Sequence, residues 1–583
     1  MRAEGSASFA VTSPPAASAE AAEARTATSY RLSRSARLRA HWPLGAILTV
    51  FALSMLIVPT LADVTISDDW VYMRSVRILV EEHKLEAHPL VSSHLVFQVL
   101  WGGLFGSVFG VTAGVMRLSI VVLWLLSGVA FYCLVWDLTA RRALSALGTA
   151  IYLFNPLGYV LAFTFMTDAP FTALLVISTY CTVRGLRGGI SDGWIIASAA
   201  AAACALLVRQ PGVFIPVGVL AALVLTRRLW FNPRSLVVAI EVGALPLLAY
   251  AGYYWWLHNI NGVPVTQTLM QSQLLDGGWN AFTTQTERLA AIEAVYIGLF
   301  VLPLTLGAAI GIRRLVLSLS TRAWVSIVIW QTLVIAGFAA LRALDMHMPY
   351  IPHFMSVAGE WLFTALTLLC ATSAVGVGFL LIRAFDADRR IGPGIAVVLA
   401  ALACQAVAAV LVSTHFRFWM IGGVPSPSLD RYLLPLLPLA LAAVLWAVRD
   451  VEIHLPLAWY VTAVLAVFAV VGTRDNIVFH QANWDLARTA VASGIPLTKL
   501  DAGGSWTGFY LGERSYSEVG IVPTYDGRWW LSLYGSVIDP EYVISAAELP
   551  GYTTISAHPY SLWLDTRPTT LYLLHRDEPP QPP

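Results

Sequence analysis

A series of long apolar segments, running from about residue 42 to residue 471, constrains this chain more than any other feature of its sequence. Hydrophobic residues make up 57% of its 583 positions and charged residues only 12%, whereas about 25% of residues are charged in a soluble globular protein. A helix needs about 20 apolar residues to cross a bilayer, and about thirteen segments approach this length. The sequence therefore predicts an α-helical polytopic membrane protein, with the lipid bilayer as a partner. The segments lie near 42–62, 114–136, 143–162, 169–187, 193–209, 212–226, 236–257, 289–311, 323–341, 360–382, 393–414, 431–448 and 455–471.

Arginine clusters occupy every second connection between these segments. Cytoplasmic loops of membrane proteins are enriched in Lys and Arg, so these connections and the arginine-rich tail before Trp42 are assigned to the cytoplasm. The segment 90–110 is apolar but contains Ser, His, Gln and four glycines. If it crossed the membrane, every later cluster would move to the outer face, so we expect an interfacial or re-entrant helix there. The clusters are Arg141-Arg142, Arg184 with Arg187, Arg227-Arg228 with Arg234, Arg313-Arg314 with Arg322, Arg383 with Arg389-Arg390, and Arg449.

The composition divides the chain into three parts. Residues 1–41 are rich in Ala, Ser, Thr and Arg and poor in large apolar residues, which predicts a disordered cytoplasmic tail. Residues 42–471 form the predicted transmembrane domain, with 63–113 as an interfacial first outer loop. Residues 472–583 contain short apolar runs punctuated by Pro and Gly, which predicts a small α/β domain. An odd number of spans places this domain on the extracytoplasmic face of a plasma membrane.

The C-terminal part has a helical pattern followed by strand-like runs. All five cysteines lie elsewhere, within apolar segments, where they pack as small apolar residues rather than form disulfides or metal sites. We find no G-x-G-x-x-G loop, Walker A or HExxH motif, and we expect no nucleic-acid partner. The expected elements of the C-terminal part are a helix at 475–494 and strands at 497–501, 542–545, 552–555, 562–564 and 570–574.

Three acids are candidates for chemistry on the predicted outer face. Asp68 and Asp69 follow the first apolar segment, and an ordinary helix start is one interpretation because Ser67 is a good N-cap. A carboxylate kept ionised at a helix start is also suited to act as a general base. Asp168 lies among apolar residues near membrane depth, where an ionisable group is costly and indicates function. Capping of the following helix is the alternative for Asp168.

Two arginines depart from the positive-inside pattern. Arg209 and Arg431 lie in the connections that alternate with the cytoplasmic ones, which places them on the outer face. Each could hold a phosphate group with two parallel hydrogen bonds, or could extend to lipid headgroups. Together with Tyr432, which follows Arg431, they form the predicted phosphate-binding set.

A divalent metal ion is a further candidate ligand of the same face. His88, His94 and His353 form the candidate metal set, drawn from a larger group of outer-face acids and histidines. The spacings match no compact metal motif, so most of these side chains are equally compatible with no metal at all. The larger group is Glu86, His88, His94, Asp345, His347 and His353.

The order of these motifs, and their predicted location on one face of the membrane, resemble those of the GT-C superfamily of glycosyltransferases. The resemblance is strongest to the protein O-mannosyltransferases and the lipid A aminoarabinose transferases. The resemblance rests on the acidic pair after the first span, on Thr167-Asp168-Ala169-Pro170 at the fourth, and on Arg431-Tyr432-x-x-Pro435 late in the membrane domain. It covers about residues 42–471. The family usually has Asp-Glu where this chain has Asp68-Asp69, and the family's metal-binding Glu has no clean counterpart here.

The resemblance implies a GT-C-like fold and a glycosyltransferase that uses a polyprenyl-phosphate sugar donor. The acceptor would be a protein, lipid or glycan on the extracytoplasmic face. Asp68 matches the family's acceptor-activating general base, Asp69 the following Glu, and Asp168 the second acidic position. Arg431 and Arg209 would stabilise the leaving phosphate. The alternatives are a transporter or flippase for lipid-linked sugars, which would need ionisable residues inside the spans, and a non-catalytic membrane scaffold presenting the C-terminal part.

Overall fold

A computed structural model describes most of the chain after the N-terminal tail, which lies outside the described residues. Six helices in the described part are long and apolar enough to cross a membrane, or seven if the bent pair α7 (Arg142–Leu153) and α8 (Pro156–Ala162) is counted as one span. The predicted polytopic helical fold is therefore confirmed, whereas the count of thirteen spans is not. The described ranges are 41–229, 233–268, 278–311, 319–343, 352–388, 391–413, 431–519, 540–565 and 567–577, with the short pieces 316, 420–421 and 424–425.

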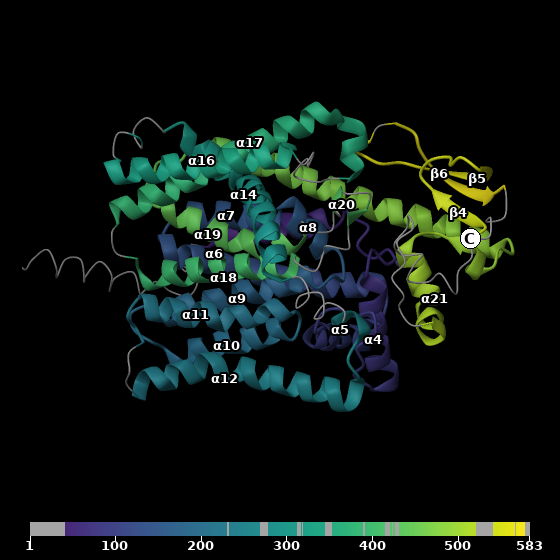
Figure 1. The fold of residues 1–583 in the computed structure, drawn as a ribbon, viewed down its shortest axis with the longest axis horizontal. Helices are drawn as coiled ribbons and strands as arrows, with labels where there is room; N and C mark the ends of the chain where they lie inside the picture. The colour runs from purple at the N-terminus through teal and green to yellow at the C-terminus, as the bar shows by residue number, and fades with distance from the viewer. Residues whose placement is uncertain are drawn as a thin grey trace, which may run out of the picture.

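The long helices lie side by side along the long axis of the molecule (Figure 1). Several helices at predicted spans, such as α19, are shorter than about 18 residues, which explains part of the difference in the count. The helices with a membrane-spanning stretch are α6 (Ala113–Thr139), α12 (Pro233–Trp256), α14 (Gly278–Ala309), α17 (Pro352–Ala387), α18 (Pro393–Ser413) and α20 (Leu455–Ala492). The other helices of the bundle are α3 (Trp42–Ser54), α9 (Asp168–Gly185), α10 (Asp192–Leu206), α11 (Phe214–Leu225), α16 (Thr321–Ala343) and α19 (Leu436–Ala447).

The predicted first loop, 63–113, contains two short helices, α4 (Asp69–Glu82) and α5 (Val96–Phe109). The 14 residues of α5 extend for about 21 Å at 1.5 Å per residue, which is less than the hydrocarbon core of about 30 Å. The start of α5 is tied to the end of α10, because the N–H groups of Leu95 and Phe97 donate to the carbonyls of Val208 and Leu207. Both helices lie at the same end of the bundle as the C-terminal sheet (Figure 1).

The C-terminal part is built on α20, a helix of 38 residues that continues without a break past the predicted domain boundary at residue 472. Its sheet has the order β3-β4-β6-β5, with β3 parallel to β4 and the other pairs antiparallel. The run 562–564 is not a strand; instead, the Asp475 carboxylate accepts hydrogen bonds from the N–H groups of Trp563 and Leu564. The strands are β3 (Leu500–Asp501), β4 (Tyr542–Ser545), β5 (Tyr552–Tyr560) and β6 (Thr569–Arg576), and α21 (Gly504–Val519) follows β3.

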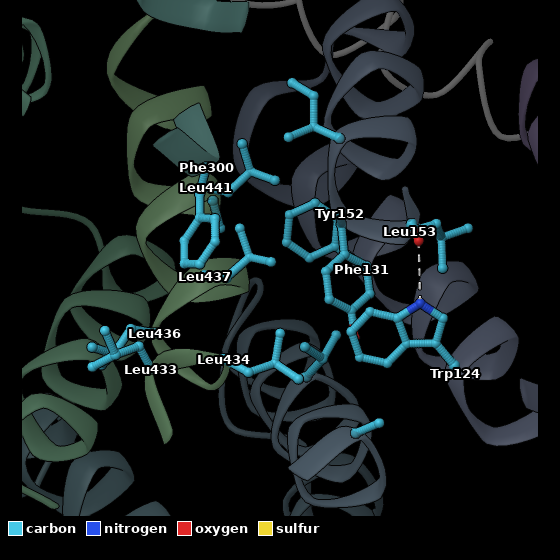
Figure 2. Packing of buried hydrophobic residues seen from close by; sticks show 14 of the residues in the cluster. Trp124, Phe131, Tyr152, Leu153, Phe300, Leu433, Leu434, Leu436, Leu437 and Leu441 are labelled. Carbon is cyan, nitrogen blue, oxygen red and sulfur yellow. Dashed lines mark hydrogen bonds between the residues drawn. The ribbon is translucent and has the colours of Figure 1, made fainter. Parts of the chain in front are cut away.

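The main hydrophobic core surrounds α19, in which every residue is buried. Figure 2 shows the leucines of α19 and of the segment before it beside Phe131 and Tyr152, from α6 and α7. In the same cluster, the indole N–H of Trp124 donates to the carbonyl of Leu153 at 3.4 Å. Leu433 and Leu434 are fully buried in this core. Because they directly follow Arg431 and Tyr432 in the chain, the core fixes the position of these two polar side chains.

Candidate functional site

A cavity of about 260 Å³ lies among several segments that are far apart in the sequence. Its charged walls are Asp168, Arg209 and Arg431, and Tyr432 lies between the two arginines. This volume is slightly below the range of about 300–1,000 Å³ typical of pockets that bury a drug-sized ligand, so it suits a headgroup rather than a whole lipid. The remaining lining residues are Tyr72, Ser92, Ser93, Thr167, Gln210, Pro211, Val213, Phe214, Gln267, Ala408, Leu411 and Val412.

Asp168 and Arg209 form a buried ion pair in the wall of this cavity. Arg209 Nη1 donates to Asp168 Oδ1, and the two side chains are only 11% and 1% exposed. Asp168 Oδ2, by contrast, is buried without a hydrogen-bond partner among the described residues. A buried charge normally has all its hydrogen bonds satisfied, so this oxygen is available to a bound group.

Arg431 connects the cavity to Asp68. Its Nη2 atom lies 3.6 Å from Asp68 Oδ2 and 3.3 Å from the Tyr432 hydroxyl, while its Nε is buried and has no partner in the described part of the chain. The guanidinium groups of Arg209 and Arg431 both lie over the Tyr432 ring, at 4.7 and 5.2 Å from its centroid. Tyr432 therefore holds two cations next to each other, an arrangement that favours an anionic ligand such as a phosphate.

Asp69 has different surroundings from Asp68. Its two oxygens accept hydrogen bonds from the backbone N–H groups of Phe165, at 2.9 Å, and Ile66, at 3.4 Å. Burial raises the pKa of Asp69 to about 7, although Arg117 and the two N–H groups act in the opposite direction. Gln98 donates to the carbonyl of Phe165 at 2.5 Å. Asp69 and Gln98 thus fix the turn that leads to Asp168, and Asp69 does not line the cavity.

The candidate metal ligands are not assembled among the described side chains. The His94 ring nitrogen Nδ1 lies 2.7 Å from the Leu206 carbonyl oxygen, and His88 packs edge-on against Trp70. Burial lowers the pKa of both histidines to about 4, so both rings are neutral at pH 7. The side chain of His353 lies outside the described residues. Within the described part, no group of three or more His, Cys, Asp or Glu is placed to hold a metal ion.

Some lining residues have no signal in the sequence. Tyr72 is fully buried one helical turn after Asp68, and burial raises its pKa above the ordinary value. Ser93, in a loop, and Gln267, in the helical turn 265–268, both reach the cavity although they are 174 positions apart. A hydrogen bond from the Gln267 amide to the Ser93 carbonyl, at 3.0 Å, joins them. Contacts between such distant segments leave no periodic pattern in the sequence. Only the assignment of residues 63–113 to the predicted first outer loop pointed to this region.

Comparisons with known proteins can be set beside this geometry. Residues 95–256 match the model of the dolichyl-phosphate-mannose-protein mannosyltransferase family. The match covers 162 of the 583 residues, and over that segment it agrees with the predicted resemblance. The matched segment includes Asp168 and Arg209, whereas Asp68 and Arg431 lie outside it. The comparison with curated protein sequences gave no match.

Three solved structures are similar in arrangement at low sequence identity. ArnT from Cupriavidus metallidurans, in the apo state, is 14% identical over 92% of this chain and 99% of its own, with a TM-score of 0.42. The oligosaccharyltransferase AglB from Archaeoglobus fulgidus is 13% identical over 86% of this chain and 64% of its own, with a TM-score of 0.42. The arabinosyltransferase EmbB from Mycobacterium smegmatis is 14% identical over 77% and 43%, with a TM-score of 0.31.

Proposed function

We propose that this protein transfers a sugar from a polyprenyl-phosphate donor to a protein, lipid or glycan acceptor on the extracytoplasmic face of the membrane. The observation that carries the proposal is the arrangement of Asp68 at 3.6 Å from Arg431, beside a cavity that also contains Arg209 and Asp168. This transfer requires two kinds of group: a carboxylate that can accept a proton, and cations that can hold a phosphate.

In the proposed reaction, Asp68 accepts the proton of an acceptor hydroxyl while the hydroxyl oxygen attacks the anomeric carbon of the sugar. The bond between that carbon and the phosphate oxygen breaks, and the electron pair leaves with the polyprenyl phosphate. Arg431 and Arg209 stabilise the negative charge that develops on this phosphate, while Tyr432 keeps the two guanidinium groups in place. A single displacement of this kind inverts the configuration of the anomeric carbon.

Asp68 is suited to the role of base because it is the accessible member of the acidic pair. Its side chain is 38% exposed, so an acceptor can reach it from outside the cavity. Its carboxylate pairs with Arg431 before the donor binds, and the approach of the donor phosphate to Arg431 competes with that ion pair. Donor binding would thus free the Asp68 carboxylate for the acceptor hydroxyl.

The sidedness of the proposal is supported by α9, which begins at Asp168 and ends at Gly185. Its 18 residues extend for about 27 Å, close to the thickness of a bilayer core. Arg184, in its last turn, joins Arg187 in pairing with Asp137. The arginine-rich end of α9 is therefore far from the cavity, as expected if the arginines face the cytoplasm and the cavity faces outward.

The apolar wall formed by Val213, Phe214 and Leu411 is a suitable place for the first part of the polyprenyl chain, since the cavity is too small for the whole lipid.

A metal requirement stays a prediction, and no step of the proposed reaction is assigned to a metal. Sugar transfer measured before and after chelation, and again after restoring Mg²⁺ or Mn²⁺, tests the metal requirement directly.

The test of the function is sugar transfer by the purified full chain in proteoliposomes. A set of undecaprenyl-phosphate sugars is supplied with an extract of candidate acceptors, and release of undecaprenyl phosphate is measured. Asp68→Asn should lower the rate by about 10²-fold or more, which is the usual contribution of a general base. Asp485→Asn, an exposed aspartate paired with Arg488, is the matched control. A wild-type rate in Asp68→Asn would overturn the mechanism.

A further inference from the structure

Three polar residues of the cavity lining have no role in the chemistry described so far. They are Ser92 and Ser93, in the segment before α5, and Gln267, in the helical turn 265–268 that follows α12. Ser93 is only 5% exposed, and its hydroxyl oxygen is buried with no hydrogen-bond partner among the described residues. An unsatisfied buried hydroxyl costs free energy, and a ligand group that bonds to it removes that cost.

The loop that carries Ser93 is held in place from both sides. The Gln267 amide donates to the Ser93 carbonyl at 3.0 Å and bonds to the hydroxyl of Tyr253. The Gln210 amide donates to the Ser92 carbonyl at 2.7 Å. Two side-chain amides thus hold two successive backbone carbonyls of one loop. The hydroxyl of Ser93 is left unpaired in a rigid setting, which is how a recognition group is usually presented.

The same cavity contains a second unpaired oxygen, the Oδ2 atom of Asp168. A serine hydroxyl can donate and accept, whereas a carboxylate oxygen accepts only. Both types of group are suited to neutral hydroxyls, and the carboxylate oxygen is unsuited to a phosphate because it repels an anion. Beside its two arginines the cavity therefore also presents two unpaired oxygens, Ser93 Oγ and Asp168 Oδ2, that can bond to the hydroxyl groups of a sugar ring.

We propose that Ser93 and the unpaired oxygen of Asp168 form the subsite that recognises hydroxyl groups of the donor sugar, and that Ser93 determines which sugar is accepted. The inference rests on the proposed function and adds the part of the cavity that distinguishes one sugar from another. A site built to hydrogen-bond a particular hydroxyl discriminates strongly against a ligand that lacks it.

The experiment compares the affinity of the full chain in nanodiscs for two ligands. One is an undecaprenyl-phosphate sugar, chosen as the tightest of mannose, glucose, galactose and arabinose derivatives, and the other is undecaprenyl phosphate without a sugar. Ser93→Ala should lower the ratio of these affinities by about 2- to 12-fold, the range expected for one lost hydrogen bond. The affinity for undecaprenyl phosphate alone should not change. Ser93→Thr keeps the hydroxyl and should keep most of the ratio.

Ser107→Ala is the control, because Ser107 is an exposed serine in α5. An unchanged ratio in Ser93→Ala, or an equal loss of affinity for both ligands, overturns the inference while leaving the proposed function in place. If the unmodified chain binds no sugar derivative more tightly than undecaprenyl phosphate and transfers none, the proposed function itself is wrong. A folded state in each variant is checked by its thermal unfolding midpoint.

Discussion

Asp68 and Asp69 are neighbours in the chain, but their carboxylates have opposite surroundings. The Asp68 side chain is 38% exposed and pairs with Arg431 at 3.6 Å, whereas Asp69 is 1% exposed and accepts two backbone hydrogen bonds. The N–H of Phe165, one of the two donors, lies three residues before Asp168. In the proposed reaction Asp68 meets the acceptor, whereas Asp69 holds the turn that leads to Asp168.

The first prediction concerns the pH dependence of stability. The pKa of Asp69 is raised by burial from 3.8 to about 7 in the folded chain. Between these two values the folded state holds a proton that the unfolded state has lost. The contribution of Asp69 to the free energy of unfolding is therefore fully present below pH 3.8, falls as the pH rises, and is constant above about 7. The Asp69→Asn variant has no titrating group at this position, so its free energy of unfolding should lack this decrease with rising pH.

The measurement is the thermal unfolding midpoint in detergent, taken for both chains across this pH interval. The difference between wild type and Asp69→Asn isolates the effect of Asp69 from that of the buried histidines. Their lowered pKa acts with the opposite sign, because it removes stability as the pH falls below 6.5. Asp485→Asn should reproduce the wild-type profile. A pH-independent difference between wild type and Asp69→Asn would contradict the assignment.

The second prediction concerns the buried ion pair of Arg209 and Asp168. Among the described residues, Arg209 is the cation bonded to the Asp168 carboxylate, which is 1% exposed. Arg209→Gln therefore leaves a buried charge without its bonded partner. We expect the free energy of unfolding to fall by about 3–5 kcal/mol, the usual cost of breaking a buried pair. Donor affinity should fall as well, because one of the two phosphate-binding cations is lost.

A double variant separates these two effects. Arg209→Gln combined with Asp168→Asn removes both charges and should recover most of the lost stability, while sugar transfer stays impaired. The coupling free energy is read from the cycle of four chains by thermal unfolding. If the change in the free energy of unfolding of the double variant equals the sum of the changes in the two single variants, the two side chains do not interact energetically.

The sequence was sufficient to predict that Asp168, Arg209 and Arg431 would lie together, but it did not predict how they would be paired, and the candidate metal set was not brought together. Alternation of arginine-rich loops assigned Asp168, Arg209 and Arg431 to one face, and all three line a single cavity. Nothing in the local pattern separated Asp69 from Asp68, because the partners of Asp69 are backbone groups, one of them 96 positions away. Ser93 was missed for the same reason, since its surroundings are set by contacts with Gln267, 174 positions away.

The structure of the C-terminal part differs from the local sequence pattern in two places. The apolar pattern ends near residue 471, yet α20 continues to Ala492 because its later turns bury Ile477, Trp484 and Leu486. The apolar run at 562–564 resembles a strand, but its backbone N–H groups bond to the Asp475 carboxylate rather than to a neighbouring strand. A local pattern cannot reveal a partner that lies on a distant helix.

The last prediction concerns the contact between α21 and α4, which lie side by side (Figure 1). Trp70 follows the acidic pair, and its indole ring lies against Gly508 and Gly512 of α21. A Cβ atom added at Gly508 would come within 2.3 Å of the Trp70 ring, and one at Gly512 within 2.6 Å. Only glycine lets the two helices approach this closely, so α21 determines where the start of α4 and its acids lie.

Gly508→Ala should therefore destabilise the chain by about 1–3 kcal/mol, the usual cost of overpacking, although alanine favours a helix by about 1 kcal/mol over glycine. The displaced Trp70 should move Asp68, so kcat for sugar transfer should fall more than donor affinity. Gly252→Ala is the matched control, because Gly252 lies within α12 and has no atom within 4 Å of an added Cβ. Combining Gly508→Ala with Trp70→Phe makes room for the methyl group and should restore part of the stability and the rate. Equal kcat values for Gly508→Ala and wild type would show that α21 does not position the acidic pair.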